Sequence, residues 1–566
     1  MKKNIFGLPL LFALSLLTTQ VWAQVSPDAG SVRQEIEKSR PENDVQKKQP
    51  PEITANGNTA AQVDKGPTIT VTSFHFSGNV LLTTAQLNAA VAGYLNRPID
   101  FSELQKAAIA VAEAYRKAGW IVRAYLPVQT IGSGVVNIAI VEAVYGRTRL
   151  EGDPPTHIAF DRLESIVGKQ QRPGAPLNSN RLDRALLLIS DLPGIAASGN
   201  LAAGKAERET DLVLRVQDQS LFSGNVTVDN TGSRFTGEVR ASATLFANSL
   251  FHIGDQTSLT YLRAQGINYG QLSATAPIGS NGWRVGPHAS YLKYDLVASE
   301  FSSLDVHGNS TSYGLDASYP LIRARSKNLY FTAALDSSRF NNLAGNVTTT
   351  KYKVSTIELG LKGHRFDSLG GGGINSAMLN VVTGKADLGG SPNEAADAAT
   401  TKVHGSFTKL RYFFSRQQQL TDASSLYVGV NGQIATKNLD SSEKFYLGGA
   451  SGVRAYPASE AGGDQGMIAN VEGRFRLPRN FSVTGFYDWG NITVNHDNSF
   501  IGASTKNSYN LQGVGVSAGW LSDFGLSVKA TWAHRVGDNP RATVTGMDQD
   551  GSLKKNRFWL QASMSF

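Results

Sequence analysis

The feature that most restricts the fold is an alternation of apolar and polar side chains that runs from about Leu221 to the last residue, Phe566. Because successive side chains of a β-strand point to opposite faces, this period of two predicts strands with one apolar face and one polar or small face. Clear examples lie at residues 238–245, 409–414, 426–430, 514–520 and 558–566. The roughly 350 residues involved can supply about sixteen strands with short turns and some long loops.

Strands of this kind fit two folds, which differ in where the apolar face points. A soluble sandwich or solenoid buries that face in a core, whereas a transmembrane antiparallel β-barrel turns it to lipid and keeps a polar lumen. Aromatic residues lie at both ends of many strands, and the chain itself ends on an aromatic residue. Beyond the leader, no stretch approaches the ~18 consecutive apolar residues that a membrane-spanning helix needs. With the export signal described next, these observations favour a barrel over residues 219–566.

The N-terminus has the three parts of a secretory signal peptide. Lys2 and Lys3 precede an apolar run at residues 5–17, and the small residue Ala23 follows it. We therefore predict a leader at residues 1–23, cleaved after Ala23, with an uncleaved anchor as the alternative. The mature protein then lies beyond the inner membrane, where ATP is not expected, which disfavours a nucleotide-driven mechanism.

A short helix is predicted in the segment 24–41, which follows the leader. Ser31 fits a helix N-cap at its start. Val32 and Ile36 are its only apolar residues, so it has almost no face to bury. The helix is either solvated or lies in a wet cavity, and a disordered tail is the alternative. Residues 42–67 are polar and contain several prolines, which indicates an extended linker.

Residues 68–143 and 144–218 repeat one order of elements, strand–helix–helix–strand–strand. In the first repeat Thr83 or Thr84 caps one helix and Ser102 caps the next. Two small α+β modules in tandem suggest an interaction array rather than one active site. Each would present a sheet edge that can take up an extended segment of another chain. Two spacer domains without a binding role are the alternative.

The stretch 443–457 is rich in glycine and alanine and carries one arginine, Arg454. Glycine lets the backbone turn and approach other chain closely, and a long arginine side chain on such a loop is suited to reach an anion. In the strand at 481–490, alternation places Asp488 on the face opposite Phe481, hence in the lumen if that aromatic side chain meets lipid. One interpretation is a docked loop that pairs Arg454 with Asp488. The alternative is a solvated arginine and a porin-like lumen carboxylate, which spacing alone favours.

The sequence lacks the residues that several chemical functions need. The chain contains no cysteine, so neither disulfides nor thiolate metal sites are available. Its nine histidines form no metal-ligand cluster, and the glycine run at 370–373 lacks the Gly-Lys-Ser/Thr of a phosphate loop. The net charge of +8 is spread along the chain and is weak evidence for nucleic-acid binding. We therefore predict neither an enzyme nor a bound cofactor or metal.

Several short motifs resemble those of one family of outer-membrane transporters. They are Phe-Tyr-Leu-Gly-Gly at 445–449 followed by Val-Arg-Ala-Tyr at 453–456, Phe-Tyr-Asp-Trp-Gly at 486–490, Asp-Asn-Thr-Gly-Ser-Arg at 229–234 and Asn-Arg-Phe-Trp-Leu-Gln at 556–561. The family comprises the two-partner secretion transporters of the Omp85 superfamily, of the haemolysin-activator, filamentous-haemagglutinin-transporter and contact-dependent-inhibition type. The resemblance extends over nearly the whole mature chain.

The resemblance implies a fold and a location. The family has an N-terminal plug helix, two periplasmic POTRA domains and a β-barrel of about sixteen strands. In this chain the plug helix would lie at 24–41, the POTRA domains at 68–143 and 144–218, and the barrel at 219–566, with a loop at 443–465 folded into it. The protein would reside in the outer membrane of a Gram-negative bacterium, with its POTRA domains in the periplasm.

The resemblance also assigns roles to individual residues. Arg454 of the inward loop would meet Asp488 of the barrel wall and lock the loop to the barrel. The family usually has glycine where this chain has Ala455, which makes the loop backbone less free and its conformation a point to check. The implied site residues are Val453, Arg454, Ala455 and Tyr456 in the loop motif, Phe486, Asp488 and Gly490 in the strand motif, and Ser31, Val32 and Ile36 in the plug helix.

The function implied is export of one large secreted β-helical protein, such as an adhesin, a haemolysin or a contact-dependent toxin. That partner would arrive unfolded, be recognised by the POTRA domains and thread the lumen after the plug leaves, without a cofactor. Further expected partners are outer-membrane lipid, periplasmic chaperones and the barrel-assembly machinery, but not nucleic acid, and the transporter is expected to be a monomer. Two alternatives are an insertase of the same superfamily, which usually has a longer POTRA array, and a diffusion porin, which lacks modules like those at 68–216.

Overall fold

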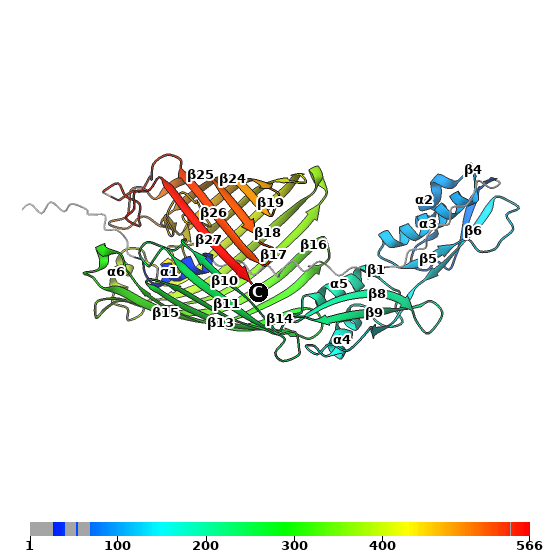
Figure 1. Cartoon of the computed structure of the whole chain (residues 1–566), viewed down its shortest axis with the longest axis horizontal. Helices are drawn as coiled ribbons and strands as arrows, with labels where there is room; N and C mark the ends of the chain where they lie inside the picture. Colours follow the sequence, from blue (N-terminus) through cyan, green and yellow to red (C-terminus); the bar gives the residue numbers. More distant parts are fainter. Residues whose placement is uncertain (1–26, 40–52, 55–67, 544) are drawn as a thin grey trace, which may run out of the picture.

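The computed structural model describes residues 27–39, 53–54, 68–543 and 545–566. The predicted leader at 1–23 lies outside these residues, as does most of the predicted linker. Figure 1 shows a barrel at one end of the long axis, with helix α1 (Ala29–Ser39) inside it. Two small modules follow one another beyond the other end of the barrel.

The first module, residues 68–143, packs its helices against a three-stranded sheet in the order β3-β6-β5. Apolar side chains on the inner faces form its core, among them Leu87, Val111 and Ile138, which are fully buried. The strand–helix–helix–strand–strand order predicted from the sequence is present, with two short strands added. Its elements are β2 (Ile69–Thr70), β3 (Ser73–Ser77), α2 (Thr84–Val91), η1 (Ala92–Tyr94), β4 (Pro98–Ile99), α3 (Phe101–Lys117), β5 (Val122–Tyr125) and β6 (Val135–Glu142).

Two predicted helix starts are wrong by less than one turn. Helix α3 begins after Asp100, whose carboxylate accepts a hydrogen bond of 2.8 Å from a backbone N–H of the first turn, so Ser102 lies inside the helix. Helix α1 likewise begins after Asp28, whose carboxylate accepts from the backbone N–H of Ser31 at 2.8 Å. Asp and Ser are about equally good N-caps, so the residue types alone could not decide between neighbouring candidates.

The second module, residues 144–218, repeats the arrangement with a sheet in the order β1-β8-β9-β7. Its outermost strand, β1 (Ile53–Thr54), comes from the segment predicted as linker and pairs in parallel with Gly199 and Asn200 of β8. The chain itself therefore covers one edge of this sheet. The other elements are β7 (Val144–Leu150), α4 (Phe160–Gln170), α5 (Ser179–Ser190), β8 (Ile195–Ala203) and β9 (Glu209–Asp218).

Sixteen antiparallel strands form a closed barrel, which confirms the predicted fold class. The last strand closes on the first, with residues 225–229 paired to 561–565. Gly224 and Phe566 extend this seam with backbone hydrogen bonds of 2.9 and 3.0 Å. The strands are β10 (Phe222–Asp229), β11 (Arg240–Asn248), β12 (Gln256–Ala264), β13 (Ile267–Ile278), β14 (Trp283–Asp295), β15 (Val306–Arg323), β16 (Lys327–Ala344), β17 (Val347–Asp367), β18 (Gly373–Asp387), β19 (Gly405–Thr421), β20 (Ser424–Ala435), β23 (Gln465–Arg476), β24 (Phe481–Thr493), β25 (Ser508–Leu521), β26 (Leu526–Arg535) and β27 (Asn556–Ser565).

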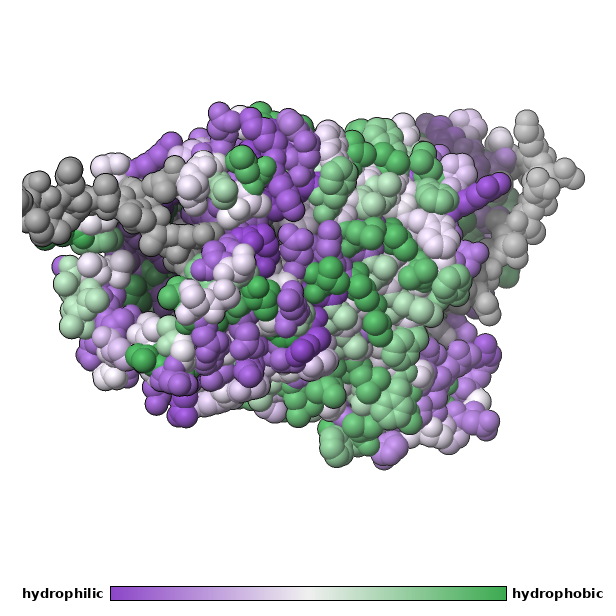
Figure 2. All heavy atoms as spheres, turned by 60° about the vertical axis from the view of Figure 1, so that its left-hand side comes forward, coloured by the Kyte–Doolittle hydropathy of each residue, from purple (hydrophilic) through white to green (hydrophobic). Residues whose placement is uncertain are grey.

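The outer wall of the barrel is apolar. Leu335 and Leu359, both in mid-strand, are 50% and 51% exposed, and Figure 2 shows hydrophobic side chains gathered over the barrel between hydrophilic zones. An exposed apolar belt of this kind is the lipid-facing surface of a transmembrane barrel. Among the helices of the described residues, none is both long and apolar enough to cross a membrane.

The second module docks on one rim of the barrel. Arg323 and Arg325, at the β15–β16 turn, form ion pairs of 2.7 Å with Asp191 and 2.8 Å with Asp183. Because successive strands alternate in direction, the connection between β20 and β23, residues 436–464, leaves the barrel at the opposite rim, which we call the far rim.

Candidate functional site: the barrel lumen and its two inserts

The connection at 436–464, here called the inward loop, folds back into the barrel. A short hairpin of β21 (Phe445–Tyr446) and β22 (Gly462–Gly463) holds its base. Its tip needs glycine at Gly452, because a Cβ atom there would lie 1.9 Å from the carbonyl oxygen of Leu447. The loop therefore has a defined conformation of its own, in which the backbone passes close to itself.

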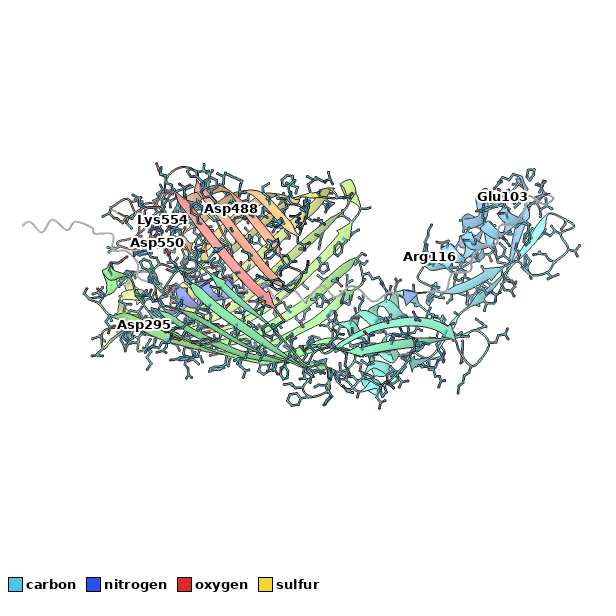
Figure 3. All side chains as sticks on the ribbon, viewed as in Figure 1. Glu103, Arg116, Asp295, Asp488, Asp550 and Lys554 are labelled. Atoms are coloured by element: carbon cyan, nitrogen blue, oxygen red, sulfur yellow. The ribbon has the colours of Figure 1, made fainter. Side chains whose placement is uncertain are left out.

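Arg454 and Asp488 are brought together where this loop meets the barrel wall. The Arg454 Nη2 atom lies 2.6 Å from Oδ1 of Asp488, Nε lies 2.8 Å from Oδ2, and the backbone N–H of Arg454 donates to Oδ2 at 3.0 Å. Asp488 is fully buried and Arg454 is 7% exposed; Figure 3 labels Asp488 on the barrel. A bidentate pair of this geometry is among the strongest contacts available to an arginine.

Three further side chains complete the surroundings of this ion pair. Glu472 Oε1 lies 2.9 Å from Nη2 of Arg454, and Asn470 Nδ2 donates to Oδ1 of Asp488 at 2.7 Å. The Phe486 ring centroid is 3.4 Å from the guanidinium carbon, a cation–π contact. A buried ion pair is tolerated only when its remaining lone pairs and protons find partners, and these side chains supply them.

The strand motif places three lumen-facing residues on β24. Phe486 stacks on the guanidinium, Asp488 binds it, and Gly490 leaves space for the loop. A Cβ atom at Gly490 would lie 3.0 Å from a Leu447 methyl and 3.1 Å from a Val453 methyl. The spacing of two residues follows from the pleat, because every second side chain faces the lumen.

Ala455 and Tyr456 are buried at the same contact. The backbone at Ala455 does not have the positive φ angle that favours glycine. Its methyl group occupies the space above Gly513, where an added Cβ would lie only 2.7 Å away. Tyr456 lies under the guanidinium of Arg535, with 4.3 Å between ring centroid and guanidinium carbon. Alanine is therefore accommodated at position 455 without backbone strain.

Sequence reasoning did not identify Asn470, Glu472 or Trp559 as parts of the site. Asn470 and Glu472 lie on β23 directly opposite the strand motif of β24, so the polar face of β23 was the available signal. The Trp559 indole N–H donates to the backbone carbonyl of Arg454 at 2.8 Å. Trp559 could have been noticed because it is an aromatic residue on the otherwise polar face of the last strand, whereas its neighbour Phe558 lies on the apolar face.

Helix α1 is the second insert, and both of its ends are tied to the inward loop. The Lys38 ammonium donates to the carbonyl of Tyr446 at 2.7 Å and to that of Gly448 at 3.3 Å. At the other end the Ser441 hydroxyl lies 2.8 and 2.7 Å from the two carboxylate oxygens of Asp28. The two inserts therefore touch each other in the lumen.

The remaining polar contacts of α1 reach the barrel wall and, at Gln34 and Glu35, also the inward loop. The backbone N–H of Ala29 donates to Asn342 Oδ1 at 2.8 Å, and Arg33 donates to the Ser338 hydroxyl. Glu35 is held between wall and loop, with its Oε1 accepting from the backbone N–H of Ser233 at 3.1 Å. Its Oε2 accepts from a serine hydroxyl of the loop at 3.0 Å. The helix is thus positioned mainly by hydrogen bonds.

The three predicted plug residues, Ser31, Val32 and Ile36, are all buried. The expectation that the helix has almost no face to bury was wrong, because Val32 and Ile36 join an apolar cluster with wall residues that include Tyr294 and Phe340. Two aliphatic side chains nevertheless contribute only about 1.5–3 kcal/mol each when fully buried. The apolar face alone could not hold the helix in the lumen.

A polar hollow of about 420 Å³ lies beside α1. Arg33, Glu37, His288, Asp336 and Arg411 are among the charged and polar side chains that line it. The imidazole of His288 has a ring nitrogen 2.9 Å from Asp336. Such a lining favours water, so the helix has the wet surroundings that its composition requires.

The described residues offer no evident catalytic or metal centre. They contain no group of three or more His, Asp or Glu side chains arranged to hold a metal ion. Residues 515–519 match the Gly-x-Ser-x-Gly pattern of a hydrolase nucleophile, but they lie in the middle of β25. Ser517 there shares a 2.8 Å hydrogen bond with Thr531 on the neighbouring strand. The pattern needs a strand-to-helix turn to expose the serine, which this location does not provide.

Comparison with known proteins gives two family matches and several relatives. The family described as haemolysin secretion/activation protein ShlB/FhaC/HecB matches residues 208–519, and the ShlB-type POTRA domain matches residues 69–143. The heme/hemopexin transporter protein HuxB of Haemophilus influenzae is 28% identical, over 97% of each chain. The outer membrane transporter CdiB of Dickeya dadantii is 24% identical, over 81% of this chain and 82% of that one.

A solved structure shares the fold. CdiB from Escherichia coli has a TM-score of 0.67 and 19% identity, covering 91% of this chain and 94% of that chain. The ShlB/FhaC/HecB match spans more than half of the chain and includes the inward loop and β24. It supports secretion over the insertase and porin alternatives. The chain therefore belongs to the haemolysin secretion/activation protein family ShlB/FhaC/HecB, whose members are outer-membrane transporters that export a partner protein and carry POTRA domains in the periplasm.

Proposed function

We propose that this transporter captures an extended segment of one unfolded exported protein and passes it through the lumen after α1 leaves, while the inward loop stays docked. The observation that carries the proposal is the difference between the two inserts. A buried bidentate ion pair fastens the loop, whereas the helix is fastened by hydrogen bonds that water can replace and by one long ion pair, 4.0 Å between Glu35 and Arg240. Folding of the partner outside the cell would give transport its direction without a nucleotide.

The energetics of the two attachments support this assignment. Separating Arg454 from Asp488 would leave a buried charge without its partner, which destabilises by about 3–5 kcal/mol. On release of α1, Lys38 and Asp28 regain hydrogen bonds with water, so each of their contacts contributes only about 1–3 kcal/mol net. Each helix contact can be exchanged for a contact with water on its own, whereas the charge of the loop's ion pair has no such replacement, and we therefore assign the movable role to the helix.

The capture surface that we propose is the open edge of β5 in the first module. β5 is an outer strand of its sheet, and Figure 1 shows it on the side of the second module. The Ala143 N–H donates to the Ile121 carbonyl at 3.1 Å, so the backbone groups of Ile121 face β6. In an antiparallel ladder the backbone groups of successive residues point alternately toward the partner strand and away from it. The N–H and C=O groups of Val122 and Ala124 therefore point away from β6. These groups can pair with an extended peptide by β-augmentation. In the second module β1 already covers the β8 edge.

Proline at position 124 tests this edge. Ala124→Pro removes an outward N–H but no bond of the β5–β6 ladder, so it should weaken crosslinking of the partner to the first module and lower its export. Ala124→Val keeps the N–H and is the matched control. Unchanged crosslinking and export in the proline variant would place capture elsewhere.

The proposed partner is one large β-helical exoprotein, such as an adhesin, a haemolysin or a contact-dependent toxin, and the family match supports this class. We propose that the transporter acts as a monomer in outer-membrane lipid, with periplasmic chaperones and the barrel-assembly machinery as further partners. The proposed domain limits are a leader at 1–23, the plug at 24–41, a linker at 42–67, POTRA domains at 68–143 and 144–218, and the barrel at 219–566.

Introduced cysteine pairs test the fate of the helix, since the chain has no cysteine of its own. A Cβ atom at Gly30 of α1 would lie 2.5 Å from Ser441 Oγ of the inward loop. Gly30→Cys with Ser441→Cys therefore brings two sulfur atoms within reach of a disulfide. Oxidation should hold α1 in the lumen and stop export, measured as partner in the medium, and a reducing agent should restore it.

The matched control fastens the loop instead of the helix. A Cβ atom at Gly490 would lie 3.1 Å from a methyl group of Val453. Val453→Cys removes a methyl group at this contact and so makes room for Gly490→Cys, and a disulfide between the two ties the loop to β24. Export should continue through this variant in its oxidised form. Continued export with α1 tethered, or arrest only when the loop is tethered, would contradict the proposal.

A further inference from the structure

The outer wall of the barrel carries a group of cations near the far rim. On β16, Ser338 and Phe340 face the lumen, where Arg33 of α1 contacts both of them. Arg339 lies between them and therefore points outward. Lys353 of β17 stands directly opposite Arg339 in the ladder. Arg339 and Lys353 are both exposed, as is Lys351, which lies two residues nearer the rim on β17.

The arrangement of these cations is unfavourable by itself. Like charges directly opposite each other destabilise an antiparallel pair, and charges beside a lipid-facing apolar wall are poorly hydrated. Asp387 faces Lys353 across the next ladder, but within the described chain no ion pair includes Arg339, Lys351 or Lys353. An anion shared between Arg339 and Lys353 would remove the repulsion.

Hydroxyl groups form the next row toward the second module. Tyr313, Ser337 and Ser355 stand side by side on β15, β16 and β17, and Lys385 follows on β18. Tyr313 is 47% exposed. Tyrosine is enriched where a membrane barrel meets the headgroup region, because its ring is apolar and its hydroxyl polar. This row therefore has the chemistry of the boundary between headgroups and hydrocarbon.

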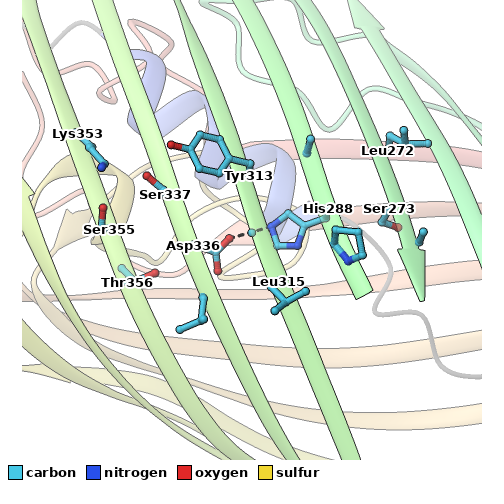
Figure 4. A pocket seen from close by; sticks show the side chains of 15 residues that line it. Leu272, Ser273, His288, Tyr313, Leu315, Asp336, Ser337, Lys353, Ser355 and Thr356 are labelled. Atoms are coloured by element: carbon cyan, nitrogen blue, oxygen red, sulfur yellow. Dashed lines mark hydrogen bonds and ion pairs between the residues drawn. The ribbon is translucent and has the colours of Figure 1, made fainter. Parts of the chain in front are cut away.

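The wall is hollowed next to this row. A depression of about 750 Å³ runs from the polar row onto an apolar surface. Its lining includes Tyr313, Ser337, Lys353 and Ser355 and, at the apolar end, Leu272, Leu315 and Leu335. Figure 4 shows Lys353, Ser337 and Ser355 gathered on neighbouring strands, with Leu315 further along. Ala274 and Ala289 also line the depression, and their small size makes room in the wall.

We propose that this surface binds a phosphorylated lipid of the outer leaflet. A phosphate group lies between Arg339 and Lys353, where arginine can bind two of its oxygens at once. The hydroxyls of Tyr313 and Ser355 bind the sugar or glycerol part, and one acyl chain fills the depression over Leu315. The order cation, hydroxyl and hydrocarbon along the wall matches the order of groups in such a lipid. The lipid would sit in the leaflet at the far rim, away from the modules.

Native mass spectrometry of the full chain in detergent tests this site. The probes are lipid A with two phosphates, the same lipid without phosphate, and phosphatidylglycerol. Wild type should retain lipid A in preference to the other two. Arg339→Gln with Lys353→Gln should weaken lipid A binding about thirtyfold, since two cations beside a lipid phosphate are lost. Heat-modifiable gel mobility verifies that each variant is a folded barrel.

A second variant pair makes the result specific. Arg263→Gln with Lys293→Gln removes two exposed outward cations of β12 and β14 near the same rim and should leave binding unchanged. Ala289→Phe fills the depression and should also weaken lipid A binding. Equal loss in the Arg263 and Lys293 variant, no loss with Ala289→Phe, or displacement of lipid A by inorganic pyrophosphate would each overturn the proposal.

Discussion

The inward loop and helix α1 share one lumen but are held there by different kinds of interaction. The loop depends on glycines that face backbone at close range and on a buried charge pair that only one geometry satisfies. The helix depends on a few aliphatic contacts, on hydrogen bonds that water can replace, and on one long ion pair between Glu35 and Arg240. The difference shows how one cavity can contain a fixed part and a removable part: the fixed contacts are those that solvent cannot replace.

The largest effect is expected where the fixed insert is released. Arg454→Met or Asp488→Asn leaves the other partner buried and unpaired, so loop docking weakens by about 3–5 kcal/mol. Export should fall at least about tenfold while the barrel still assembles, measured by partner in the medium and by heat-modifiable mobility. Arg474→Met is the control, since that arginine touches Glu472 but its side chain is 36% exposed. Normal export in both test variants would remove the loop from the mechanism.

Removing the helix should have the next largest effect, which is a gain of conductance rather than a loss of export. Deleting residues 31–40 opens the lumen without touching the Arg454–Asp488 pair, so conductance in planar bilayers should rise several-fold. Glu37→Gln changes an α1 side chain that is 42% exposed and should leave conductance near that of wild type. If the deletion variant conducts like the intact chain, α1 does not obstruct the pore.

A smaller effect is expected from pH. Burial lowers the pKa of Lys38 to about 8 in the inserted helix, whereas a released lysine titrates near its usual value of ~10.4. Between these values the released state binds the extra proton, so raising the pH through this window favours insertion and should lower conductance. Lys38→Met should abolish this alkaline decrease; a decrease that persists in the variant would assign it to another group.

Glu35 should act in the opposite direction on the acid side. Burial raises the pKa of Glu35 in the inserted helix, although Arg240 opposes the shift. The inserted state therefore binds a proton that the released state does not, and acidification should favour insertion. Glu35→Gln should remove this acid dependence while leaving the alkaline one of Lys38 in place, which conductance at a series of pH values would separate.

The smallest effect is expected from Ala455→Gly, which restores the residue usual in the family. The methyl group lost is worth about 0.8 kcal/mol of burial, and glycine adds about 0.5–1 kcal/mol of backbone entropy to the undocked loop. Protease sensitivity of the loop should rise slightly and export should not change. A marked loss of export would show that Ala455 does more than pack against Gly513.

The barrel could be predicted from sequence because its signal is local. An alternation of side chains follows directly from the pleat, and it placed Asp488 in the lumen before any contact was known. The pairing of Asp488 with Arg454 was different. Spacing alone favoured a solvated arginine, and only the resemblance to a family made docking the preferred interpretation, because loop conformation depends on contacts far apart in the sequence.

Other features were beyond the reach of local patterns. Burial of α1 depends on a cavity built by the barrel, and only Val32 and Ile36 gave any apolar signal. The pairing of Ile53 with Gly199 joins a segment without strand character to an edge that already existed. Glu472 and Trp559 act on Arg454 from other strands, so their roles become visible only when strand neighbours are known.

The seam between the first and last strands has a mechanical consequence. Only five residue pairs join β10 to β27, whereas thirteen join β24 to β25. If a force pulls the barrel wall apart, the wall opens first between the two strands that share the fewest backbone hydrogen bonds. These strands are β10 and β27, beside Phe566. Because its two strands come from opposite ends of the barrel sequence, we expect this seam to be the last to close during assembly. The two backbone hydrogen bonds between Phe566 and Gly224 lengthen this short seam.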